Sequence, residues 1–198
     1  MAWERDEQDE ELPSLRTRRT FGWILRGDVK AGALELREYD MCACDANETL
    51  WMAADAAGYD ASQAIYALCS QWRDLGMSVA AYGSVLELGG LWLLPSQGKA
   101  CGAQILNAFV RTACRGYSLV ILKAFPLEYE SKLGDEPALK VGFEHRKRAM
   151  QRYYARSLGM KPFPGPTGDA GWMWKPAKRV AKFIAPPTYS DDPFPEDE

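Results

Sequence analysis

The chain has 198 residues, of which 47% are hydrophobic and 12% aromatic, and this composition excludes a wholly disordered protein. The net charge is only −3, but the charges are unevenly distributed: acidic residues dominate 1–12 and 190–198, and basic residues dominate 140–182. Runs of like charge at chain ends are typically solvated and mobile. We therefore expect a flexible acidic arm over residues 1–17, one domain over residues 18–184 and a flexible acidic tail over residues 185–198.

The sequence favours a cytoplasmic protein without membrane contact. No apolar run approaches the roughly 20 residues that a membrane-spanning helix needs. The first residues, MAWERDEQDEELP, lack the basic start and apolar core of a secretory signal. The five cysteines are an odd number without the spacing of a disulfide framework, which indicates free thiols in a reducing compartment.

The N-terminal third predicts two strands followed by two helices. Large apolar side chains alternate with smaller or polar ones in Thr20–Arg26, and Ala33–Tyr39 alternates leucines with Glu35 and Arg37, so the two segments predict an antiparallel pair. Helices are expected over Asn47–Ala57 and Ala61–Leu75. Gly76 is placed to end the second helix.

The remaining elements alternate between strands and helices. The sequence predicts a buried strand over Val85–Leu94, which the Gly89-Gly90 pair interrupts with a bulge, and then a helix over Lys99–Arg115. A second buried strand over Leu119–Phe125 and a loop-rich connection over Leu127–Gly142 follow. The last elements are a basic helix over Phe143–Leu158, which ends at Gly159, and a short strand over Gly171–Lys175. This order predicts an α/β fold built on a mixed sheet.

An anion-binding loop is predicted within Leu91–Ala113. An apolar strand ends at Pro95, a loop with Gly98 and Gly102 follows, and an amphipathic helix begins. The first N–H groups of a helix have no partner within it, and the helix dipole places partial positive charge there. The loop is therefore suited to a phosphate or pyrophosphate group.

This region resembles the GNAT (Gcn5-related N-acetyltransferase) superfamily. The loop Gln97-Gly98-Lys99-Ala100-Cys101-Gly102 is similar to the family's signature of Gln or Arg, two residues, Gly, one residue, and Gly or Ala, with Ala100 in the place of the first glycine. Tyr153-Tyr154, followed by Leu158-Gly159, resembles the family's aromatic-Tyr pair and Leu-Gly-Phe motif, and Trp172–Lys175 occupies the place of its last strand. The resemblance covers roughly Val85 to Lys175. It implies a mixed, largely antiparallel sheet flanked by helices.

The resemblance also implies a reaction: direct transfer of an acetyl group from acetyl-CoA to a primary amine. The cofactor would contact main-chain groups of the central strand and the loop, which here are Leu93, Leu94, Gln97, Gly98, Lys99, Ala100, Cys101, Gly102 and Ala103. Members of the family often use an acid on the central strand as general base, and Glu87 is the only carboxylate in Val85–Leu94. A tyrosine would protonate the leaving thiolate, and this would be Tyr154, with Tyr153 as the alternative.

Other interpretations stay open at this point. Glu87 could be a charge on the surface of its strand, and Tyr154 could belong to the core. A GNAT-like protein that has lost turnover would act by binding a partner protein or coenzyme A. The acceptor could be an amine-bearing small molecule or a protein. Many members of the family pair as homodimers. The acidic ends and the lack of a DNA-reading motif argue against nucleic acid as a partner, and no cluster predicts a metal site.

Overall fold

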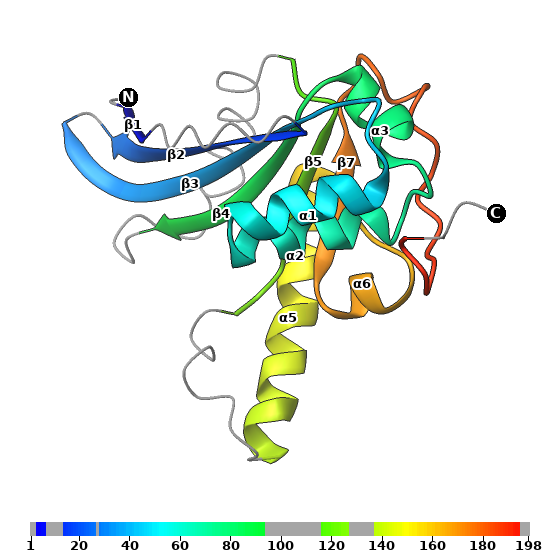
Figure 1. Ribbon diagram of the computed structural model, residues 1–198. Coiled ribbons are helices and arrows are strands. Elements are labelled where there is room, and N and C mark those ends of the chain that lie inside the picture. Colours follow the sequence, from blue (N-terminus) through cyan, green and yellow to red (C-terminus); the bar gives the residue numbers. More distant parts are fainter. Residues whose placement is uncertain (1–2, 7–13, 27, 94–115, 127–136, 195–198) are drawn as a thin grey trace.

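The computed structural model describes residues 3–6, 14–26, 28–93, 116–126 and 137–194 (Figure 1). Its strands are β1 Trp3–Asp6, β2 Leu15–Arg26, β3 Val29–Met41, β4 Val85–Leu93, β5 Leu119–Lys123, β6 Lys161–Pro162 and β7 Trp172–Pro176. Its helices are α1 Asn47–Ala57, α2 Tyr59–Cys69, α3 Leu75–Ser78, the 3₁₀ turn η1 Ala80–Tyr82, α5 Pro137–Leu158 and α6 Gly165–Asp169.

The strands within these ranges form one sheet in the order β1-β2-β3-β4-β5-β7-β6. Neighbouring strands are antiparallel except β4 and β5, which are parallel. The prediction of a mixed, largely antiparallel sheet flanked by helices is therefore confirmed.

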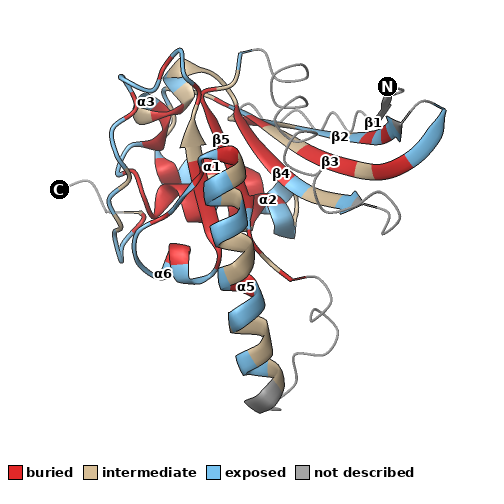
Figure 2. Ribbon diagram, turned by 180° about the vertical axis from the view of Figure 1, so that it is seen from behind, coloured by how far each residue is buried: buried red, intermediate tan, exposed pale blue. Residues whose placement is uncertain are grey.

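Each face of the sheet has its own hydrophobic core, because side chains alternate between the two faces of a strand. Tyr39, Val85 and Ile121 pack with α1 and α2 on one face. Leu36 and Leu122 belong to the core of the other face, which includes the end of α5. Figure 2 shows the buried residues concentrated in the strands and in α2. The sheet therefore lies between α1–α2 and α5.

Several of the predicted elements are confirmed. The pair β2–β3 is antiparallel, and α1 has the predicted bounds. The predicted second helix, in contrast, ends at Cys69 rather than Leu75. The Asn47 side-chain amide donates to the Trp72 carbonyl at 2.8 Å and its oxygen accepts from the Leu75 N–H at 2.9 Å, which turns the chain. Gly76 does not end a helix but lies buried within α3.

The basic helix α5 begins at Pro137, earlier than the predicted Phe143, so the predicted connection is helical over its last six residues. Proline is well suited to the first turn of a helix, where its missing N–H has no partner to lose. The helix ends at Leu158 and Gly159 follows with φ of 68°, as the sequence predicts. The N-terminal half of α5 projects away from the sheet (Figure 1). No helix in the described ranges has both the length and the apolar character needed to cross a bilayer.

Both predicted chain ends need correction. The sheet reaches into residues 1–17, because β2 begins at Leu15 and β1 pairs with it. Residues 185–194 pack against α1 and the end of α2, where Asn47 donates to the Pro193 carbonyl and the Phe194 ring lies 5.3 Å from that of Trp51. The tail is therefore part of the packed domain as far as residue 194. An acidic composition did not prevent this because Phe194 supplies an apolar anchor.

The start of the parallel pair is held by a close backbone approach at Gly83. Its φ is 130°, and a Cβ at this position would lie 2.1 Å from the Gly116 carbonyl oxygen. The Arg179 guanidinium donates to that same oxygen and to the Tyr82 carbonyl. The segments that precede β4 and β5 are thereby locked together.

We expect Gly83→Ala to destabilise the fold by roughly 1–2 kcal/mol for the positive φ, plus the cost of the clash. Gly58→Ala is the matched control, since Gly58 has φ of 124° and a Cβ added there would meet nothing within 4 Å. Urea unfolding should therefore show a larger loss for Gly83→Ala than for Gly58→Ala. Equal losses would contradict the close approach.

Candidate functional site

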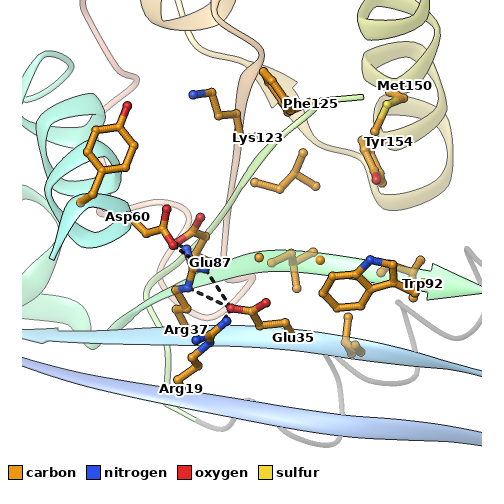
Figure 3. A pocket seen from close by; sticks show the side chains of 17 residues that line it. Arg19, Glu35, Arg37, Asp60, Glu87, Trp92, Lys123, Phe125, Met150 and Tyr154 are labelled. Carbon is orange, nitrogen blue, oxygen red and sulfur yellow. Dashed lines mark hydrogen bonds and ion pairs between the residues drawn. The ribbon is translucent and has the colours of Figure 1, made fainter. Parts of the chain in front are cut away.

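The candidate site lies where β4 and β5 part. The two strands pair from Val85 with Leu119 to Leu88 with Leu122. Beyond Leu88 the predicted bulge is present, since Leu36 pairs with Leu88 and Glu35 pairs with Gly90, and among the described strands β4 continues beside β3 alone. A cavity of about 610 Å³ opens at this point (Figure 3).

Side chains from both faces of the sheet line this cavity. Arg37, Asp60 and Glu87 reach it from the face that carries α1 and α2. Leu122 and Tyr154 reach it from the α5 face. Because the strands separate here, side chains from opposite faces of the sheet line the same cavity.

Glu87 is a buried carboxylate at the cavity wall, with an exposed fraction of 6%. The Tyr39 hydroxyl donates a hydrogen bond to its Oε2 at 2.5 Å, and the Arg37 Nη1 lies 3.6 Å from the same oxygen. Burial raises the pKa of Glu87, and the Tyr39 hydrogen bond and the Arg37 charge only partly oppose this. A carboxylate with a raised pKa is suited to accept a proton near neutral pH.

Arg37 is the centre of an ion-pair network beside Glu87. It lies directly opposite Glu87 in the β3–β4 register. Its Nη2 is 2.9 Å from Glu35 Oε1 and 2.8 Å from Asp60 Oδ2. Arg19 on β2 pairs with Glu35 at 2.7 Å. The guanidinium thus fixes the positions of three carboxylates around one side of the cavity (Figure 3).

Tyr154 and Lys123 occupy other parts of the cavity wall. Burial raises the pKa of Tyr154, with a further contribution from Tyr153, so its hydroxyl stays protonated. Burial lowers the pKa of Lys123, while the carboxylates of Glu87 and Asp60 oppose that shift. Tyr153 has 39% of its surface exposed and does not line the cavity. Of the two candidate tyrosines, Tyr154 is therefore the one that the fold places at the cavity.

The structure places Glu87 and Tyr154, which the sequence singled out separately, in the lining of one cavity. Leu93 is the last residue of β4. The rest of the predicted cofactor contacts and the helix over Lys99–Arg115 lie outside the described residues; the contacts concerned are Leu94, Gln97, Gly98, Lys99, Ala100, Cys101, Gly102 and Ala103.

Sequence reasoning missed Tyr39, Arg37, Asp60 and Lys123. The alternation of Glu35 and Arg37 with Leu34 and Leu36 did indicate that both charges share one face of β3. It could not indicate that Glu87 would lie opposite Arg37, because that depends on the register of β4. Asp60 joins them only because α2 packs across the same face.

Within the described ranges, no group of three or more His, Cys, Asp or Glu side chains is placed to hold a metal ion. Comparison with known proteins finds no significant match to a family model, a curated protein or a solved structure.

Proposed function

We propose that the protein is an acyl-CoA-dependent N-acetyltransferase of the GNAT type, which moves an acetyl group from acetyl-CoA to a primary amine. The observation that carries the proposal is that a buried carboxylate, Glu87, and a tyrosine, Tyr154, line one cavity at the end of the parallel strand pair. The motif around Gln97–Gly102 supports the choice of cofactor.

Glu87 is the proposed general base. An amine attacks a carbonyl carbon only in its neutral form, so its proton must be removed. The carboxylate of Glu87 accepts this proton from the acceptor nitrogen, and the Tyr39 hydrogen bond and Arg37 hold the carboxylate in position. The three residues come from the face that α1 and α2 cover, so we expect the amine to enter from that face.

The main chain of β4 is suited to donate a hydrogen bond to the thioester carbonyl of acetyl-CoA. Acetyl-CoA supplies the activated carbonyl, and an N–H donor beside it would stabilise the negative charge that develops on its oxygen. Beyond Leu88 no strand in the described ranges pairs with the β4 edge that turns away from β3. The donors of Gly89–Leu93 on this edge are therefore candidates for that contact.

Tyr154 is the proposed proton donor to sulfur. As the nitrogen–carbon bond forms and the carbon–sulfur bond breaks, the leaving thiolate takes the proton of the Tyr154 hydroxyl. We expect Tyr154→Phe to lower kcat by roughly 10²-fold, the lower end of general acid catalysis, with little change in the affinity for acetyl-CoA. Steady-state kinetics and a cofactor titration would measure both values. Tyr153→Phe is the matched control, since its side chain lies outside the cavity lining, and it should retain turnover.

A thermal-shift assay combined with thiol detection tests the assignment. Acetyl-CoA at 100 times its dissociation constant should stabilise the fold by about 2.7 kcal/mol. Release of free coenzyme A with a panel of primary amines would support the transferase. Stabilisation without thiol release would instead support a protein of this type that binds but does not turn over. The absence of any shift at millimolar acetyl-CoA would refute both.

A further inference from the structure

The sheet face that carries Glu87 continues into an exposed aromatic patch, which consists of Phe21, Trp23 and Trp92. Their exposed fractions are 39%, 45% and 44%. In Figure 1 the strands β2, β3 and β4 extend past α1 and α2, so the helices do not cover this end of the face. Large apolar side chains gathered on one uncovered surface commonly mark a binding site.

The strand register places this patch on the same face as Glu87. Trp23 pairs with Ala33, and Ala33 pairs with Trp92, so the two indoles flank a small residue across three strands. Phe21 pairs with Glu35, which itself lines the cavity. Without the bulge at Gly89-Gly90, the alternation along β4 would put Trp92 on the opposite face from Glu87. The bulge therefore aligns Trp92 with the carboxylates.

Trp92 connects the patch to the cavity. Its indole lies over Gly90, because a Cβ at Gly90 would be 2.4 Å from the Trp92 Cη2 atom. Trp92 and Gly90 both line the cavity. Trp92 and the carboxylates of Glu35, Asp60 and Glu87 thus line the same cavity (Figure 3), and the register places Trp23 and Phe21 beside it on the same face of the sheet.

We propose that this side of the cavity and the patch beside it form the acceptor subsite, which takes a primary amine carried on a planar aromatic body. The proposal rests on the acyl transfer proposed above. The aromatic body would lie against Trp92 above Ala33, where ring contacts are favourable, and beside Trp23, whose ring carries the Lys30 ammonium 3.9 Å from its centroid. The amine would point toward Glu87, and the Asp60 carboxylate, which is 64% exposed, would attract it in its charged form. Ala33 leaves space between the indoles that a larger residue would fill.

Isothermal titration of the full chain with tryptamine tests the subsite, with and without coenzyme A present. Ethanolamine has the amine but no ring, and tryptophol has the ring but no amine. We expect tryptamine to bind at least about tenfold more tightly than either comparator, because only it uses both parts of the subsite. Equal affinity for tryptamine and ethanolamine, or no tryptamine binding in either condition, would overturn the proposal.

Three variants locate the binding. Trp92→Ala removes one ring, and Gly90→Ala keeps the ring but displaces it, since the new methyl would occupy its place. Each should weaken tryptamine binding by roughly twofold to tenfold, the range expected for one aromatic contact. Phe183→Ala is the control, because Phe183 is also exposed but stacks on Tyr82 away from the cavity lining. Unchanged affinity in both Trp92→Ala and Gly90→Ala would refute the subsite.

The outcomes separate this subsite from the transferase activity. Titration measures binding alone. Tryptamine binding that depends on Trp92 but yields no acetylated product would therefore support the subsite and refute the transferase activity. Conversely, the transferase activity would be supported and the subsite refuted if ethanolamine were acetylated at the same rate as tryptamine and if Trp92→Ala left both rates unchanged.

Discussion

Glu87→Gln is expected to reduce turnover by roughly 10² to 10⁴-fold, the range that general base catalysis contributes. The amide cannot accept a proton from the amine, but its oxygen can still accept the Tyr39 hydrogen bond, so the fold should persist. Steady-state thiol release gives the rate, and circular dichroism checks the fold. Glu48→Gln is the matched control, because Glu48 is an exposed carboxylate in the first turn of α1, away from the cavity. Full activity in Glu87→Gln would exclude Glu87 as the base.

The raised pKa of Glu87 also predicts how activity and stability depend on pH. Burial raises the pKa of Glu87, so wild-type activity should fall as the pH drops through that raised value. The folded protein also binds this proton more tightly than the unfolded chain, and the resulting stability is present at low pH and lost as the pH rises through the folded pKa. We therefore expect the free energy of unfolding in urea to fall for wild type, relative to Glu87→Gln, as the pH rises through the folded pKa of Glu87.

Deletion of residues 185–198 is expected to destabilise the protein by about 2–4 kcal/mol, or roughly 5–15 °C in Tm. The deletion removes the Phe194 ring from Trp51 and Tyr66. It also removes the Ala185 carbonyl, which accepts from the Trp72 indole N–H at 3.0 Å. These losses expose apolar surface and leave partly buried donors without partners.

Two shorter changes serve as controls for the tail. Removal of residues 195–198 alone keeps every contact named above, so it should lower Tm less than the full deletion. Phe194→Ala should account for about 1–2 kcal/mol of the loss, as expected for a half-buried ring. If the variant that lacks residues 185–198 has the same Tm as wild type, residues 185–194 do not stabilise the domain.

The local elements of this fold follow from short-range patterns in the amino-acid sequence. The alternation in Thr20–Arg26 and Ala33–Tyr39 predicted a hairpin, the apolar spacing after Asn47 predicted α1, and Gly89-Gly90 predicted the bulge. These features depend on neighbours within a few residues, and side-chain periodicity reports such preferences directly. For the same reason Glu87 could be selected as the one carboxylate of its strand.

The surroundings of Glu87, in contrast, depend on contacts between distant segments. The Arg37 contact depends on the register between β3 and β4, and the position of Trp92 depends on the change of face at the bulge. The choice of Tyr154 over Tyr153 depends on how α5 packs against the sheet, and the docking of residues 185–194 depends on α1, far away in the chain. Local periodicity contains no information about which distant segments will meet, so these features required the folded chain.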